Sequence, residues 1–274
     1  MGESVPALAV IGGGAMASAI LHGAAEAGVL GRVCVAEPEA ERRKNFDVAV
    51  PTAAEALEWL GANESEPGSG QVMLAVKPQM LGDVAAEISP LVRKRVVISI
   101  LAGLPGDRIR AQLGGSCRVV RVMPNTPAQV RKGTTAIALT AGATNADAAF
   151  ADRIFHAVGD VVVRLDESMM DAFTAVAGSG PAYLFYLAEA MQQGALAVGF
   201  DTDTARTIVE QTIFGAAELL HSDDASAAEL RRRVTSKKGT TQAATDTFDT
   251  LGVMHAIARG IVAARDRGIE LGRD

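Results

Sequence analysis

The sequence predicts an α/β fold in its N-terminal part and an all-α fold in its C-terminal part. Up to about residue 165, short apolar runs rich in β-branched residues alternate with segments of helical periodicity. This alternation is typical of a parallel sheet wound with helices on both faces. From residue 166 onward the strand pattern ends, and an alanine-rich helical periodicity continues. We therefore predict two domains, residues 1–165 and 166–274.

Seven segments have the length and composition of buried strands. The last two are expected at one edge of the sheet, where antiparallel pairing is an alternative to parallel pairing. Helical periodicity fills the stretches between several of them, and a polar segment rich in Gly, Pro and Ser, Gly61–Gly70, predicts a surface loop. The expected strands are Leu8–Ile11, Val33–Glu37, Val72–Val76, Val96–Ile100, Arg118–Val122, Thr134–Leu139 and Val161–Leu165, and the expected helices include Met16–Ala27, Pro78–Ile88 and Leu104–Leu113.

Composition excludes several classes of protein. The net charge is −6, with no broad basic stretch, so a nucleic-acid partner is not expected. Cys34 and Cys117 lie far apart in apolar runs, which argues against a disulfide framework or a zinc site and favours buried thiols. The N-terminus lacks a basic leader, and no apolar run is long enough to span a bilayer. We expect a cytoplasmic protein without a metal or a membrane partner.

One predicted helix, Pro181–Val198, is apolar nearly all round. A helix without a polar face must be buried. Because a domain of about 110 residues has limited capacity to cover it, we expect the C-terminal half to form a subunit interface.

The first strand runs directly into a glycine-rich turn, Gly12-Gly13-Gly14-Ala15-Met16-Ala17, which matches G-x-G-x-x-A. In a Rossmann domain the first glycine allows the tight turn, the second lets the backbone approach a pyrophosphate, and the following helix N-terminus attracts the phosphates. A glycine turn without a ligand is the alternative. The position between a strand and a helix favours dinucleotide binding by residues Ile11 to Met16.

The preference between NADPH and NADH stays open. Glu37 follows the second strand, where an acidic residue usually binds the ribose 2′-hydroxyl of NAD. Arg42, Arg43 and Lys44 come soon after it and offer charge for a 2′-phosphate, although a solvated helix face explains them equally well.

Four further stretches follow the glycine turn along the chain: Ala75-Val76-Lys77-Pro78, Arg121 to Pro127 (RVMPNTP), Ala177 to Tyr183 (AGSGPAY) and Val234 to Thr241 (VTSKKGTT). In this order and at these spacings they resemble the pyrroline-5-carboxylate reductase family. The resemblance covers essentially the whole chain, and it implies a Rossmann domain followed by an all-α C-terminal dimerisation domain. It also implies reduction of Δ1-pyrroline-5-carboxylate to L-proline with NADPH or NADH, the last step of proline biosynthesis, in homodimers that assemble further, often into decamers.

The resemblance implies which residues line the cofactor. Strand ends at the carboxyl edge of an open α/β sheet bind ligands, and two of the matching segments follow such strands. Asn125 lies between two prolines, in a stiff loop suited to hold an amide near the nicotinamide; a structural turn is the alternative. The implied cofactor residues beyond the glycine turn are Glu37, Ala75, Val76, Lys77, Pro78, Ile100, Leu101, Ala102 and Asn125.

The stretch VTSKKGTT is the implied substrate loop, because hydroxyls and free N–H groups at a helix start suit a carboxylate. The implied substrate residues are Ser236, Gly239, Thr240 and Thr241, together with Glu167; a simple helix cap uses the same groups. Thr241 is the candidate proton donor to the imine, and a pre-protonated substrate is the alternative.

Lys238 departs from the family pattern in this loop, because relatives usually carry glycine there. The substitution places a side chain where the backbone φ is expected to be positive.

Two other functions remain open from the sequence. One is another NAD(P)-dependent dehydrogenase of the same two-domain plan, which usually needs a Lys or His acid/base in the helical domain. The other is a non-catalytic NADPH-binding sensor, which has no need for the Gly239–Thr241 segment. The presence of both the glycine turn and that segment favours the reductase.

Overall fold

The N-terminal part is built on one eight-stranded sheet in a computed structural model that describes residues 5–273. The strand order is β3-β2-β1-β4-β5-β6-β7-β8. Strands β1 to β6 are parallel, whereas β7 is antiparallel to β6 and β8 is parallel to β7, so the expected reversal at one edge is confirmed. The strands are β1 Leu8–Ile11, β2 Val33–Ala36, β3 Ala49–Val50, β4 Gln71–Leu74, β5 Val96–Ser99, β6 Arg118–Met123, β7 Thr134–Leu139 and β8 Val161–Arg164.

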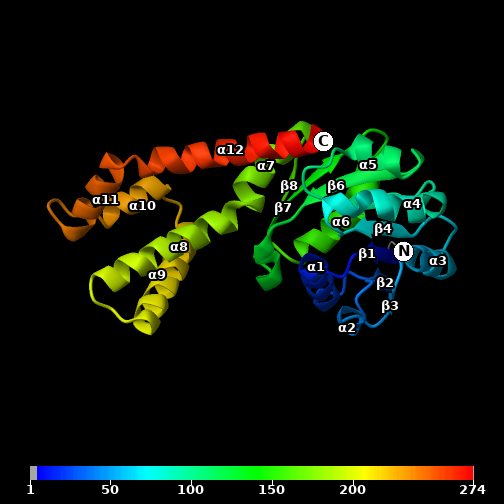
Figure 1. Cartoon of the computed structure of the whole chain (residues 1–274), viewed down its shortest axis with the longest axis horizontal. Helices are drawn as coiled ribbons and strands as arrows, with labels where there is room; N and C mark the ends of the chain where they lie inside the picture. The colour runs from blue at the N-terminus through cyan, green and yellow to red at the C-terminus, as the bar shows by residue number, and fades with distance from the viewer. Residues whose placement is uncertain (1–4, 274) are drawn as a thin grey trace. The chain divides into compact units, whose positions relative to one another are not determined.

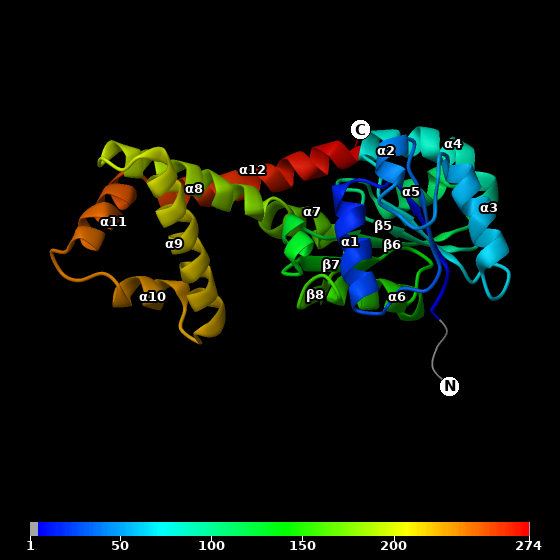
Figure 2. The ribbon, with the colours of Figure 1, turned by 90° about the horizontal axis from the view of Figure 1, so that it is seen from below.

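Helices cover both faces of this sheet (Figures 1 and 2). Alternate residues of β1 enter different cores: Leu8 and Val10 pack on one face, Ala9 and Ile11 on the other. Because both faces are buried, the parallel strands are continuous apolar runs without polar alternation. One face is covered by α1 (Ala15–Glu26) and α6 (Asn145–His156), the other by α3 (Ala53–Asn63), α4 (Leu81–Val92) and α5 (Gly106–Gln112).

Four predicted strands end one or two residues earlier than expected, at Ala36, Leu74, Ser99 and Arg164. The residue that follows each strand still donates its N–H to a carbonyl of a neighbouring strand, and the chain then turns away at the edge of the sheet. Three elements between β2 and β4 were not predicted from the sequence: the four-residue α2 (Ala40–Arg43), the two-residue β3 and the 11-residue helix α3. A single helical turn and a two-residue strand are too short to produce a periodic pattern.

Both cysteines are buried and free, at Cys34 in β2 and Cys117 before β6. Burial, with a contribution from Glu55, raises the pKa of the Cys34 thiol to about 11. Burial also raises the pKa of the Cys117 thiol. Protonated, inaccessible thiols act as small core hydrophobes, as the sequence indicated.

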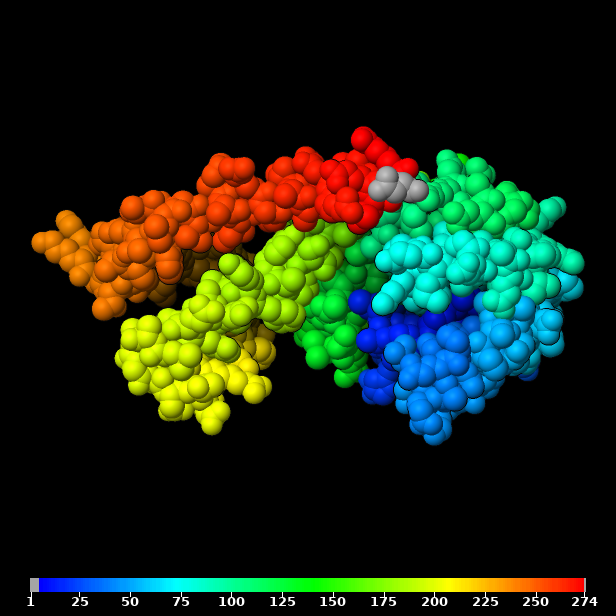
Figure 3. All heavy atoms as spheres, viewed as in Figure 1, coloured from blue at the N-terminus to red at the C-terminus, as the bar shows by residue number. Residues whose placement is uncertain are grey.

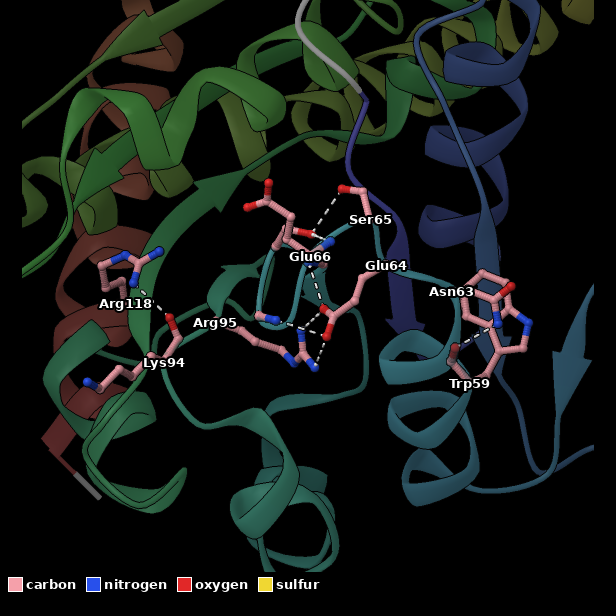
Figure 4. A network of polar contacts seen from close by, with 11 residues as sticks. Trp59, Asn63, Glu64, Ser65, Glu66, Lys94, Arg95 and Arg118 are labelled. Carbon is pink, nitrogen blue, oxygen red and sulfur yellow. Dashed lines mark hydrogen bonds and ion pairs between the residues drawn. The ribbon is translucent and has the colours of Figure 1, made fainter.

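The predicted loop 61–70 is ordered around one carboxylate, that of Glu64 (Figure 4). Helix α3 extends to Asn63, so the first three residues of the predicted loop are helical. The Glu64 carboxylate accepts hydrogen bonds from the N–H groups of Gly68 at 2.9 Å and Gly70 at 3.0 Å. It also forms an ion pair with Arg95, whose Nη2 lies 3.0 Å from Oε1. The loop therefore closes the amino edge of the sheet.

Packing extends the sheet-containing unit beyond residue 165. The described chain forms two compact units, residues 5–179 with 264–273 and residues 180–263. After β8 come η3 (Glu167–Met169), α7 (Met170–Phe173) and a π-helical turn, η4 (Thr174–Gly178). Met170 is buried against Ala136 and Ala138 of β7, which holds this connection to the sheet. The division by packing thus differs from the predicted boundary at 165/166.

The second unit is entirely helical among the described residues. Helix α8, the predicted apolar helix, packs along α9 and has no buried residue in the single chain. Phe185 and Tyr186 of α8 are 67% and 75% exposed, and Leu251 is 72% exposed. The yellow-green α8 is uncovered on the face seen in Figure 3. An apolar surface of this extent is typical of a subunit interface. The helices are α8 Gly180–Ala197, α9 Thr202–Ser222, α10 Ala227–Arg233, α11 Thr240–Thr250 and the start of α12 Val253–Arg273.

In the described part of the chain, no helix has the length and apolar character needed to traverse a membrane.

Candidate active site

The glycine turn joins β1 to α1 at the carboxyl edge of the sheet. Gly12 has φ +106°, and a Cβ on it would lie 2.8 Å from the carbonyl oxygen of Ala75. Gly14 is the N-cap of α1, with no side chain bonded to the cap and no neighbour within 4 Å of an added Cβ. The first N–H groups of α1 are therefore open to a ligand, as a pyrophosphate requires.

Two neighbouring strand ends lie at the same edge. The N–H of Ala75 donates to the carbonyl of Ile11 at 2.8 Å, and the N–H of Ile100 donates to that of Leu74 at 3.0 Å. Lys77 is exposed, and Pro78 begins the short helix η1 (Pro78–Met80). The structure thus brings the segments 75–78 and 100–102 together with the glycine turn. Val76 and Ile100 are half-buried, Leu101 is buried and Ala102 is exposed.

Glu37 is almost fully buried beside the glycine turn, at 5% exposure. Its Oε2 accepts the N–H of Gly13 at 3.0 Å, and its Oε1 accepts the N–H of Glu39 at 3.0 Å. The carboxylate therefore holds the glycine turn in place through the Gly13 N–H. It also lies after β2, where a residue that binds the cofactor ribose is expected.

The amide of Asn125 is used within the protein. Its Nδ2 donates to the carbonyl of Ala177 in the π-helical turn at 3.1 Å, and its Oδ1 accepts the N–H of Thr134 at 2.9 Å. Asn125 thus joins the turn after β6 to β7 and to the chain leaving the sheet. A direct contact of Asn125 with the nicotinamide stays a prediction. The structure adds a second role, because Asn125 holds the π-helical turn in position, and such turns are common at functional sites.

Glu167 also bonds inside the sheet-containing unit. Its Oε1 accepts the N–H of Gly106 at 2.6 Å and Nη1 of Arg121 at 3.1 Å. Arg121 is 7% exposed, and sequence reasoning gave it no role, although an arginine inside a valine-rich strand signals a buried partner. The predicted contact of Glu167 with substrate stays a prediction.

Apart from Glu167, the predicted substrate residues lie together in one loop of the helical unit, just before and at the start of α11. Gly239 is the N-cap of α11 without a side-chain cap, and its N–H donates to the carbonyl of Ser236 at 3.0 Å. Thr240 is exposed and Thr241 is half-buried in the first turn. These hydroxyls and the open N–H groups of the first turn suit a carboxylate.

Lys238 adopts the left-handed conformation, with φ +59°. The positive φ expected where relatives carry glycine is therefore present. The N–H of Lys238 donates to Oε1 of Gln242 at 2.7 Å, a contact that ties the loop to α11.

The residues of the sheet unit fit a dinucleotide: a close-approach glycine, an uncapped helix start and an acidic residue after β2 lie at one edge. Together they define a Rossmann-fold dinucleotide-binding protein.

Two family models match the chain, one in its N-terminal part and one in its C-terminal part. A model of NADP oxidoreductase, coenzyme F420-dependent, matches residues 7–103, and a model of pyrroline-5-carboxylate reductase dimerisation matches residues 167–271. The pyrroline-5-carboxylate reductase of Pseudomonas aeruginosa is 37% identical over 98% of this chain and 97% of that protein. That of Synechocystis sp. is 39% identical over 97% of this chain and 98% of that protein. The chain belongs to the pyrroline-5-carboxylate reductase family.

A solved structure agrees in fold over the full length. The pyrroline carboxylate reductase of Plasmodium falciparum with NADP bound superposes with a TM-score of 0.84 at 25% identity, covering 98% of this chain and 99% of that chain. The predicted α/β Rossmann domain with a helical dimerisation domain is thereby confirmed.

Proposed function

We propose that this protein reduces Δ1-pyrroline-5-carboxylate to L-proline with NADPH or NADH, as the last step of proline biosynthesis. The observation that carries the proposal is identity of 37% to a reductase of that name over nearly the whole of both chains. The open helix start at Gly14 and the open helix start at Gly239 supply the two anion sites that the cofactor and the substrate need.

The bound dinucleotide supplies the hydride, and the protein supplies position and charge. The turn Gly12–Gly14 and the N–H groups of α1 hold the pyrophosphate. The loop before α11 holds the substrate carboxylate through its N–H groups and the Thr240 hydroxyl. The hydride goes to C5 of the imine, and a proton goes to the nitrogen, from the Thr241 hydroxyl or from solvent before binding.

The assembly and location extend the same proposal. The dimerisation model over residues 167–271 and the exposed apolar side chains of α8 support an oligomer. We propose a homodimer formed through the helical unit, assembling further to a decamer, in the cytoplasm and without nucleic acid or membrane partners. Light scattering on the purified protein measures the subunit number, and a monomer at micromolar concentration contradicts this part.

The test of function is consumption of NADPH in the presence of pyrroline-5-carboxylate, followed by absorbance. A β-hydroxyacid with oxidised cofactor is the control for another dehydrogenase. The proposal expects turnover with the imine alone. Turnover with the hydroxyacid alone supports the dehydrogenase alternative, and cofactor binding without any turnover supports the sensor.

The variant pair Thr241→Val and Thr241→Ser tests the proton donor. If the hydroxyl donates, Thr241→Val lowers kcat by about 10²-fold or more and Thr241→Ser retains most of it. If the substrate arrives protonated, both variants keep kcat within about threefold and the role of Thr241 as donor is overturned.

A further inference from the structure

The segment after β2 contains a carboxylate, that of Glu37, with no ion pair to a cation among residues 5–273. Glu37 lies level with the glycine turn, because the N–H of Gly12 donates to the carbonyl of Ala36 at 2.9 Å. The two oxygens of Glu37 each accept one backbone N–H, from Gly13 and from Glu39. A carboxylate has about four acceptor positions, so capacity for one ligand hydroxyl remains.

The three nearby cations are engaged elsewhere. Arg42 Nε lies 2.8 Å from Oε2 of Glu39, and Lys44 Nζ lies 2.7 Å from Oε1 of Glu41. Neither side chain reaches Glu37 in the described structure.

Arg43 is the one of these three cations that contacts the turn after β2, and it bonds there to backbone. Its Nη1 donates to the carbonyl oxygens of Glu37 and Pro38, both at 2.8 Å. The guanidinium therefore closes the turn after β2, and in the described part of the chain it is bonded to these carbonyls and not to the Glu37 carboxylate. A 2′-phosphate at this edge would meet a fixed negative charge whose position is set by the glycine turn itself.

We propose that Glu37 is the residue that determines cofactor specificity at the adenosine ribose. Its carboxylate accepts a hydrogen bond from the 2′-hydroxyl of NADH and opposes the 2′-phosphate of NADPH, so the protein binds NADH at least as tightly as NADPH. This inference rests on the dinucleotide site of the proposed function and is independent of the substrate.

The first test uses the unmodified protein and needs no turnover. Calorimetry compares adenosine 2′,5′-bisphosphate with 5′-AMP, and NADPH with NADH. The proposal expects the bisphosphate to bind no tighter than 5′-AMP. If the protein has side chains that bind a 2′-phosphate, the bisphosphate binds about tenfold or more tightly than 5′-AMP, because charge-assisted phosphate contacts are strong. That result overturns the proposal.

The second test removes the charge and keeps an acceptor for Gly13. Glu37→Gln is expected to raise the ratio Kd(NADH)/Kd(NADPH) by about tenfold, because repulsion of the phosphate is lost. Glu41→Gln, the same charge change on an exposed side chain of the same segment, is the matched control and keeps the ratio within about twofold. A folded Glu37→Gln protein with an unchanged ratio overturns the proposal; if the variant does not fold, the adenosine nucleotide comparison decides.

A third variant, Arg43→Gln, tests the competing assignment. The proposal expects the affinities for NADH and NADPH to change by similar factors, because Arg43 holds the turn through its carbonyls. A selective loss of NADPH affinity of about tenfold makes Arg43 the phosphate ligand and overturns the proposal. Binding of both cofactors without imine reduction would instead contradict the proposed function and leave this inference standing.

Discussion

Two buried carboxylates each organise a glycine-containing loop of the sheet unit, at opposite edges of the sheet. Glu64 accepts the N–H groups of Gly68 and Gly70 at the amino edge and is paired with Arg95. Glu37 accepts the N–H of Gly13 at the carboxyl edge, and no cation of the described residues pairs with its carboxylate. Both carboxylates therefore accept backbone N–H groups of a glycine-containing loop. The charge of Glu64 is neutralised by Arg95, whereas the charge of Glu37 is available to act on a ligand.

The difference separates a structural loop from a ligand site. A carboxylate that is paired with a cation and hydrogen-bonded is already neutralised and does not need a ligand. Removing such a carboxylate leaves the buried cation without its partner. A carboxylate held only by backbone N–H groups keeps acceptor capacity at the edge where open α/β sheets bind ligands.

The strongest test of this contrast is Glu64→Ala. It leaves Arg95 and two N–H groups without their partner, so the free energy of unfolding should fall by about 3–5 kcal/mol. The affinity for NADPH should stay within about twofold, because the loop lies at the other edge of the sheet. Urea unfolding and cofactor titration measure the two quantities. Glu66→Ala, an exposed carboxylate of the same loop, is the control; equal destabilisation by both variants would contradict the assigned role of the ion pair.

The second largest effect is expected at Gly12. An added Cβ would lie 2.8 Å from the Ala75 carbonyl at φ +106°, so Gly12→Ala should cost about 1–3 kcal/mol of stability and abolish tight cofactor binding. Gly14→Ala meets no neighbour within 4 Å and has φ −70°, so it should fold normally. It should nevertheless weaken cofactor binding, because its methyl group occupies the approach to the pyrophosphate. Normal cofactor binding by Gly12→Ala would break the account of the turn.

Acid stability provides a third test. Burial raises the pKa of the Glu64 carboxyl, but the hydrogen bonds from Arg95, Gly68 and Gly70 outweigh it, so the pKa lies below its usual value of 4.5. A carboxylate with a depressed folded-state pKa stabilises the protein above its unfolded-state pKa and loses that contribution as the pH falls through the folded-state pKa. Stability should therefore decline below about pH 4.5, and Glu64→Gln should flatten that decline. Urea unfolding at a series of pH values measures it; an identical pH dependence in the variant would show that Glu64 is not the group responsible.

The ligand-binding side of the contrast between the Glu37 and Glu64 loops could be predicted from the sequence. The glycine turn, the alternation of strands and helices and the edge position of the last two strands were predicted from local patterns. The positive φ at Lys238 was expected from the family resemblance, because relatives carry glycine at that position. Glu37 was identified by its spacing from Gly14.

The partners of buried charges were not available from the sequence. Arg95 lies 31 residues from Glu64, and Arg121 lies 46 residues from Glu167. Such pairs depend on which strands become neighbours, which local periodicity does not encode. For the same reason Asn125 was assigned only to the cofactor, whereas its amide also bonds Ala177, 52 residues away.

The smallest effect is expected at Lys238, where glycine is not obligatory. Its φ of +59° lies in the left-handed minimum that non-glycine residues reach at modest cost. Lys238→Gly should therefore stabilise the protein by at most about 1 kcal/mol. Lys238→Asn, which tolerates this conformation, is the control for the loss of charge. A large destabilisation by the glycine variant would show that the lysine side chain itself holds the loop.

The most direct test of the account follows the transferred hydride. The protein is incubated with pyrroline-5-carboxylate and NADPH carrying deuterium on both C4 positions, and the product is analysed by mass spectrometry. The account predicts L-proline with a single deuterium on C5. Unlabelled proline, or oxidation of the cofactor without proline, would contradict it.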